Sequence, residues 1–133
     1  MKRTLIEMFL AACLGMAVVI IPVALDPNSK KYDAAFLPWI RNGVEGAKPI
    51  SYLLLVIVGA IFGYFGRGHF GFVGMATMAL FPIWSCLDMF MGNDHNLFPI
   101  EWIFYGIQSL LGMLGAGIGR FIAKRNGPEP WYR

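Results

Sequence analysis

The sequence predicts an all-α integral membrane protein in which four transmembrane helices pack as two antiparallel hairpins. Apolar residues make up 57% of the 133 residues and charged residues only 14%, against about 25% charged in an ordinary soluble domain. The apolar residues gather in four stretches close to the roughly 20 residues that a helix needs to cross a bilayer. We therefore expect a single domain, residues 1–133, with spans at about 5–25, 50–66, 70–88 and 100–123.

The first span follows Lys2 and Arg3, a basic start that also occurs in signal peptides. No A-x-A cleavage pattern precedes Asp26. A Leu-Ala-Ala-Cys stretch ending at Cys13 is similar to a lipoprotein lipobox, but a dozen apolar residues follow it. We expect the span to be retained, with Glu7 as an interfacial carboxylate that Lys2 and Arg3 neutralise.

The external loop, residues 26–49, is too polar to cross a bilayer and too aromatic to remain in water. An interfacial segment fits this composition, with Tyr32 and Trp39 at headgroup depth and Lys30, Lys31 and Arg41 near phosphates. The alternative is a cap folded over the external mouth of the bundle.

The second and third spans are joined by the short turn R-G-H-F-G, which predicts a tight antiparallel hairpin. The second span places Gly59, Gly63 and Gly66 on one face, and small residues four apart let helix backbones approach closely in lipid. In the third span, Pro82 cannot donate the helical hydrogen bond, so we expect the outer half to bend.

The fourth span carries the most informative face of the chain. Positions alternately four and three residues apart share one side of a helix. Here the first half of that side is polar and the second half is bare glycine, a pattern that calls for another helix against it. The face consists of Glu101, Tyr105, Gln108, Gly112, Gly115 and Gly119.

The two halves of the chain echo each other, which suggests a tandem duplication. G-M-A, proline and Leu-Asp recur in the first and third spans, and the second and fourth spans begin P-I-S-Y and P-I-E-W and end Gly-Arg. Parallel repeats related by an axis along the membrane normal would bring the glycine faces of the second and fourth spans together. Chance similarity in an apolar alphabet is the alternative.

A polar pocket open to the outside is the sharpest candidate site. Gln108 lies about 12 Å below the start of its span, where an amide needs a partner on another helix or in a water-filled cavity. Helix-to-helix hydrogen bonding is the alternative role, and an acidic rim would attract a cation or amine. The candidate residues are Ser85, Asp88, Glu101, Tyr105 and Gln108.

Asp94 and His95 extend this acidic rim along the external turn between the third and fourth spans. The spacing matches no metal motif, so we predict no metal site, and the sequence indicates no particular cofactor. Ordinary turn chemistry is the alternative role for this stretch.

Basic residues at both ends of the chain and at Arg67 would lie on one side of a four-span protein. The positive-inside rule makes that side cytoplasmic, so we expect both termini inside, in a bacterial inner membrane. The net charge of +3 is explained by this arrangement without a nucleic-acid partner.

Two function classes follow from these observations. The first is a subunit of an oligomeric transporter or channel, or an accessory subunit of a larger membrane complex, because glycine faces left toward lipid would suit a homo-oligomer or another membrane subunit. The second is a membrane enzyme or ligand-binding protein that uses the external acidic and histidine rim.

Overall fold

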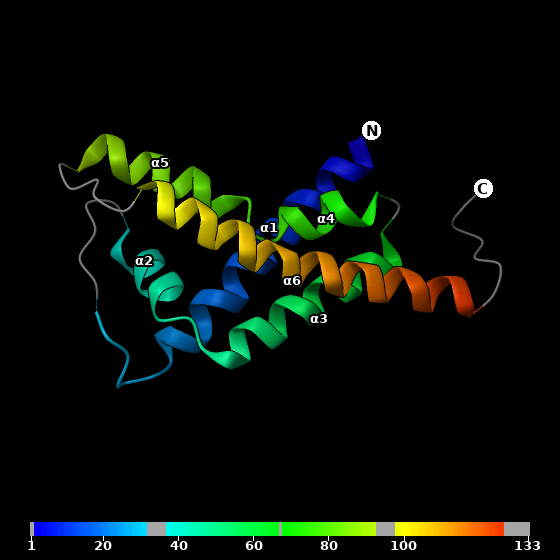
Figure 1. Ribbon diagram of the computed structural model, residues 1–133, viewed down its shortest axis with the longest axis horizontal. Helices are drawn as coiled ribbons and strands as arrows, with labels where there is room; N and C mark the ends of the chain where they lie inside the picture. Colours follow the sequence, from blue (N-terminus) through cyan, green and yellow to red (C-terminus); the bar gives the residue numbers. More distant parts are fainter. Residues whose placement is uncertain (1, 32–36, 67, 93–97, 127–133) are drawn as a thin grey trace.

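The computed structural model shows a bundle of six α-helices, with no strand in the parts of the chain it describes, residues 2–31, 37–66, 68–92 and 98–126 (Figure 1). The helices are α1 (Lys2–Ala24), α2 (Pro38–Glu45), α3 (Pro49–Phe65), α4 (Phe70–Ala76), α5 (Leu80–Met91) and α6 (Phe98–Arg125).

Three helical segments are long and apolar enough to cross a membrane: α1, the α4–α5 stretch and residues 100–125 of α6. A fourth results if α2 and α3 count as one span, but they meet at 96°. Helix α3 alone has 17 residues and is about 26 Å long. Large apolar side chains cover the outer faces, as in a small membrane protein.

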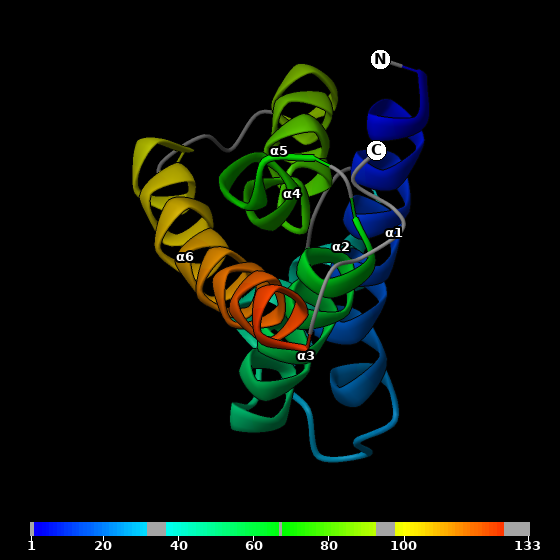
Figure 2. The same cartoon turned by 90° about the vertical axis from the view of Figure 1, so that its right-hand side faces the viewer.

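The helix pair with the most extensive contact in the described chain is α3 and α6, which run in the same direction and cross near the middle of the bundle (Figures 1 and 2). A Cβ atom added at Gly59 would lie 2.2 Å from the carbonyl oxygen of Gly112, and one at Gly115 only 2.0 Å from that of Val56. Gly63 faces Ala116 in the same way. The glycines of both helices therefore meet backbone to backbone within a single chain.

The contact between α3 and α6 bears on the predicted duplication and on the predicted hairpins. The two faces meet as a parallel duplication would require, while the duplication itself stays a hypothesis. Helices α3 and α6 belong to different predicted hairpins, so the hairpins are not separate packing units. Gly119 joins the contact, 2.0 Å from the carbonyl oxygen of Ala60 by the same measure, whereas Gly66 ends α3 and its carbonyl accepts a hydrogen bond from Arg120 at 2.8 Å.

The third predicted span is interrupted at residues 77–79, between α4 and α5. The Thr77 hydroxyl donates to the Gly74 carbonyl at 2.7 Å, and Thr77 is fully buried between Gly15 of α1 and Gly112 of α6. Pro82 lies one turn later, and its ring excludes a regular helix over the preceding turn. Helix α4 packs closely on α6, but α5 has few contacts with it.

The loop at residues 26–49 returns to the bundle through α2, which packs on the end of α1. Ile40 is buried in the core, and Gly43 lies against Ile20. This placement corresponds to the cap interpretation of the loop. Trp39, which is half exposed, faces outward, where it suits an interface.

The two ends of the loop are joined by an ion pair between Asp26 and Lys48. Asp26 also accepts a hydrogen bond from the Asn28 backbone N–H at 2.9 Å. The hydrogen bond from Lys48 and then that from Asn28 lower the pKa of Asp26 below its usual value of 3.8. The pair thus closes residues 26–48 into a loop that carries α2.

We expect Asp26→Asn to lower the hydrogen-exchange protection of the α2 amides at neutral pH, because the loop loses this closure. A carboxylate with a lowered folded pKa stabilises above its unfolded pKa, and the contribution is lost as the pH falls through the folded value. Wild-type protection should therefore fall toward that of the variant as the pH drops below 3.8. Lys30→Gln, at an exposed residue of the same loop, is the control, and equal loss in both variants would contradict the assignment.

Candidate functional site

A cavity of about 360 Å³ opens at the end of the bundle where α2 lies. Its size is within the range of small-molecule sites, about 300–1,000 Å³. Four helices contribute to its wall, which carries four aromatic side chains and charged groups from α2 and α6. The lining residues are Arg41, Val44, Glu45, Tyr52, Trp84, Ile100, Glu101, Phe104, Tyr105 and Gln108.

The break between α4 and α5 makes this cavity possible. At Gly74 and Gly112 the backbones of α4 and α6 are in contact, but beyond the break large side chains separate α5 from α6. The rings of Phe81 and Tyr105 stack with centroids 5.8 Å apart, and farther out the Ser85 hydroxyl donates to Glu101 at 3.1 Å. Small residues therefore let α4 pack directly against α6. Large side chains keep α5 and α6 apart, and the cavity lies on this side of the break.

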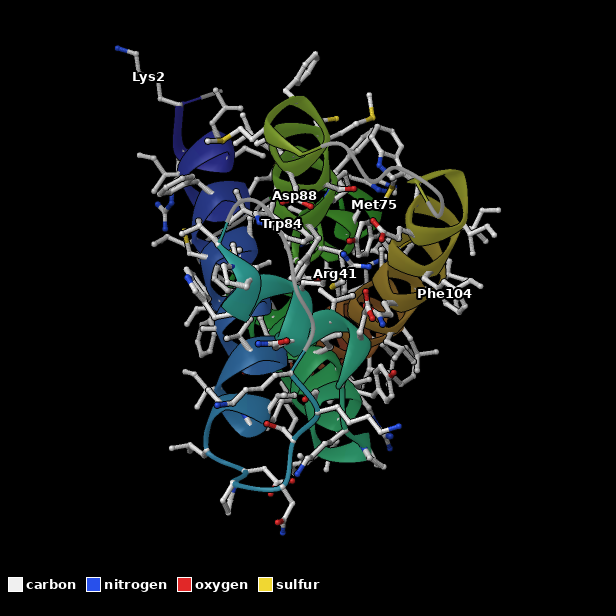
Figure 3. All side chains as sticks on the ribbon, turned by 90° about the vertical axis from the view of Figure 1, so that its left-hand side faces the viewer. Lys2, Arg41, Met75, Trp84, Asp88 and Phe104 are labelled. Atoms are coloured by element: carbon white, nitrogen blue, oxygen red, sulfur yellow. The ribbon has the colours of Figure 1, made fainter. Side chains whose placement is uncertain are left out.

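Opposite charges meet at the mouth of the cavity. Arg41 of α2 bonds Glu45 one turn later, with Nε 2.5 Å from Oε1. In Figure 3 Arg41 lies at the centre of this end, with Asp88 and Trp84 from α5 on one side and Phe104 from α6 on the other. The hydrogen bond to Glu45 raises the pKa of the Arg41 guanidinium, and the charges of Glu101 and Asp88 add to the effect.

Among the described residues, the carboxylates that act on Arg41 outnumber it. Three carboxylates, Glu45, Asp88 and Glu101, act on one guanidinium, which leaves two negative charges when all are ionised. An acidic rim was predicted to attract a cation. Arg41 of the same chain supplies part of that positive charge. A second cation can still be accommodated electrostatically.

The inner wall of the cavity carries a buried acceptor without a donor. Gln108 is 8% exposed, and its Oε1 has no hydrogen-bond partner among the described residues. An unsatisfied buried acceptor costs about 1–3 kcal/mol. Its neighbour Ser109 is equally buried, but the Ser109 hydroxyl donates to the Gly106 carbonyl at 2.6 Å. Gln108 therefore differs from Ser109, whose hydroxyl is satisfied within its own helix.

The predicted pocket residues are close together in the structure. Glu101, Tyr105 and Gln108 line the cavity, Ser85 bonds Glu101, and Asp88 acts on Arg41 from α5 without lining the cavity. Asp94 and His95 lie outside the described residues. The other seven lining residues were not predicted from the sequence: Arg41, Val44, Glu45, Tyr52, Trp84, Ile100 and Phe104.

For two of these residues the sequence contains a signal that could have placed them together. Arg41 and Glu45 are oppositely charged and four residues apart, which is the spacing of an ion pair on one helical face. Tyr52 and Trp84 had none, because an aromatic residue near the end of a membrane helix is equally suited to the lipid interface.

The described residues contain no cluster of three or more His, Cys, Asp or Glu side chains that could hold a metal. Cys13 and Cys86 are both free thiols. The side chains that line the cavity can bind through hydrogen bonds, charge and aromatic contact, and these interactions define the chemistry of the site.

Comparison with known proteins adds no relative from which a function could be transferred. No protein-family model, no curated protein and no solved structure matches this chain. The case for a function therefore rests on the cavity and its side chains.

Proposed function

We propose that this small membrane protein binds an amphipathic amine in the cavity beside α2. The observation that carries the proposal is the unpartnered Oε1 of Gln108, on the wall of a cavity whose mouth has an excess of carboxylates. A protonated amine supplies both missing elements, a hydrogen-bond donor and a positive charge.

The rest of the wall suits the body of such a ligand. Tyr52, Trp84 and Tyr105 present aromatic surface, which attracts cations and packs against apolar groups. Because Arg41 shares the carboxylates, the bound amine would compete with an internal guanidinium. We infer moderate affinity and selectivity for ligands with an apolar group attached to the charge.

The test is calorimetric titration of 2-naphthylmethylamine into the protein in phosphatidylcholine nanodiscs, with empty nanodiscs as the blank. The neutral alcohol 2-naphthylmethanol is the matched ligand. We expect Gln108→Leu to weaken amine binding about tenfold, since a lost hydrogen bond to a charged donor is worth about 1.5 kcal/mol or more. Glu101→Gln should weaken binding of the amine but not of the alcohol.

Ser109→Ala is the control variant, because Ser109 is adjacent, equally buried and absent from the lining of the cavity. It should bind the amine as the wild type does. Equal binding of amine and alcohol, unaffected by Gln108→Leu, would refute the proposal.

A subunit role in an oligomeric transporter, channel or larger complex is the second candidate. We place it second because the glycines that motivate it already contact each other within one chain. The positive-inside rule would put both termini in the cytoplasm and the cavity outside, as expected for uptake or sensing of an external amine. The mass of the protein in nanodiscs separates the candidates: several copies would favour an oligomer.

A further inference from the structure

Two hollows on the outer surface of α4 and α6 join into one trough at the opposite end of the bundle from the amine cavity. The first, about 400 Å³, is lined by His69, Phe70, Gly117, Arg120, Phe121 and Lys124. The second, about 510 Å³, continues along α6 over leucine, methionine and isoleucine side chains. The two hollows share Phe70, Gly117 and Phe121 and so form one trough. We call the first, basic hollow the head of the trough and the second, apolar hollow its groove.

Within the part of the chain that the structure describes, the head of the trough is lined by three basic side chains and by no carboxylate. Arg120 is held in place by donating to the Gly66 carbonyl at 2.8 Å. The Nδ1 atom of His69 accepts the Gly71 backbone N–H at 3.2 Å, which leaves the ring proton on Nε2 as a donor. The ring of His69 also stacks on Phe70, with centroids 4.8 Å apart. Lys124 follows Arg120 by one turn.

The floor of the groove is open at Gly117. A Cβ atom there would meet only the Phe70 ring, at 3.9 Å and beyond. From Lys124 to Leu110 the trough follows 14 residues of helix, or about 21 Å. One leaflet of the hydrocarbon core is about 15 Å thick, so the groove has the length of a headgroup region plus one layer of acyl chain.

We propose that this trough binds one anionic phospholipid. Its phosphate contacts His69, Arg120 and Lys124, and an acyl chain lies over Gly117 and Met113. Basic pockets between membrane helices are a recurrent recognition mode for anionic headgroups. The occupant is assigned by charge complementarity at the head and by the length and apolar lining of the groove, and the assignment does not depend on the amine cavity.

Native mass spectrometry of the protein in mild detergent tests the proposal, with dioleoyl phosphatidylglycerol and dioleoyl phosphatidylcholine as probes. We expect the wild type to retain phosphatidylglycerol preferentially. Lys124→Gln should reduce this preference about fivefold, the effect of one interfacial charge. Arg125→Gln removes the same charge one position later, at a residue that lines neither hollow, and should leave the preference unchanged.

A second pair of variants tests the groove. Gly117→Leu fills it and should lower retention of phosphatidylglycerol, whereas Gly106→Leu adds the same side chain on α6 where a Cβ meets nothing within 4 Å. Equal effects of Lys124→Gln and Arg125→Gln would indicate general surface charge and overturn the proposal. Displacement of the lipid by millimolar inorganic phosphate would overturn it too, because the site would then bind phosphate rather than a phospholipid.

Discussion

Gly115→Ala should lower the free energy of unfolding by about 3 kcal/mol, although it adds a single methyl group. The added Cβ would lie 2.0 Å from the Val56 carbonyl oxygen and 3.0 Å from the Ala60 nitrogen. These are backbone atoms, which cannot turn aside as a side chain can. Helices α3 and α6 would have to separate, and the neighbouring contact between Gly59 and Gly112 would be lost with them. Unfolding in mixed micelles of mild detergent and sodium dodecyl sulfate provides the measurement.

The control for this variant lies on the same helix. A Cβ at Gly106 meets no atom within 4 Å. Gly106→Ala should therefore be neutral or stabilise by about 0.5–1 kcal/mol, because alanine favours a helix over glycine. If both variants unfolded alike, α3 and α6 would not be in backbone contact.

Gln108→Leu should raise the free energy of unfolding by about 1 kcal/mol in the absence of ligand. The substitution removes an acceptor that is buried without a donor and replaces it with an apolar group of similar size. The same change should weaken amine binding, so stability and function would move in opposite directions, as is common at binding sites. Thermal unfolding in nanodiscs, with and without 2-naphthylmethylamine, measures both effects.

Ser109→Ala is again the matched control for stability. The Ser109 hydroxyl is already paired with its own helix at 2.6 Å, so its removal should not stabilise the protein. A destabilised Gln108→Leu protein would show that the amide is paired within the bundle and would count against the ligand site.

Sequence periodicity was sufficient to predict an all-helical protein with helices apolar enough to cross a membrane, but it predicted neither α2 nor the complete break between α4 and α5. The glycine positions follow from helical spacing alone, and the second and fourth spans of a four-span protein necessarily run in the same direction. Glu101, Tyr105 and Gln108 could be grouped for the same reason. These predictions depend only on the three- and four-residue spacing of side chains along a single helix.

The remainder of the site depends on tertiary contacts. Pro82 predicted a bend in the third span, but the break lies at residues 77–79, where Thr77 is buried between Gly15 and Gly112, which lie far apart in sequence. Likewise, α2 has only eight residues, and its position over the cavity depends on Ile40 reaching the core. The amphipathic pattern of α2 indicates a buried face that includes Ile40 and Gly43, but it does not indicate what this face packs against.

The parallel contact of α3 and α6 also bears on how the protein is made. Gly59 and Gly112 are 53 positions apart (112 − 59), and ribosomes add about 5–20 residues per second. Helix α3 therefore waits on the order of 3–10 seconds in the membrane for the helix it packs against. During that interval its glycine face is open to other nascent segments or to insertion factors. Released chains that end before α6 should be removed by quality-control proteases, whereas the full-length chain should be resistant.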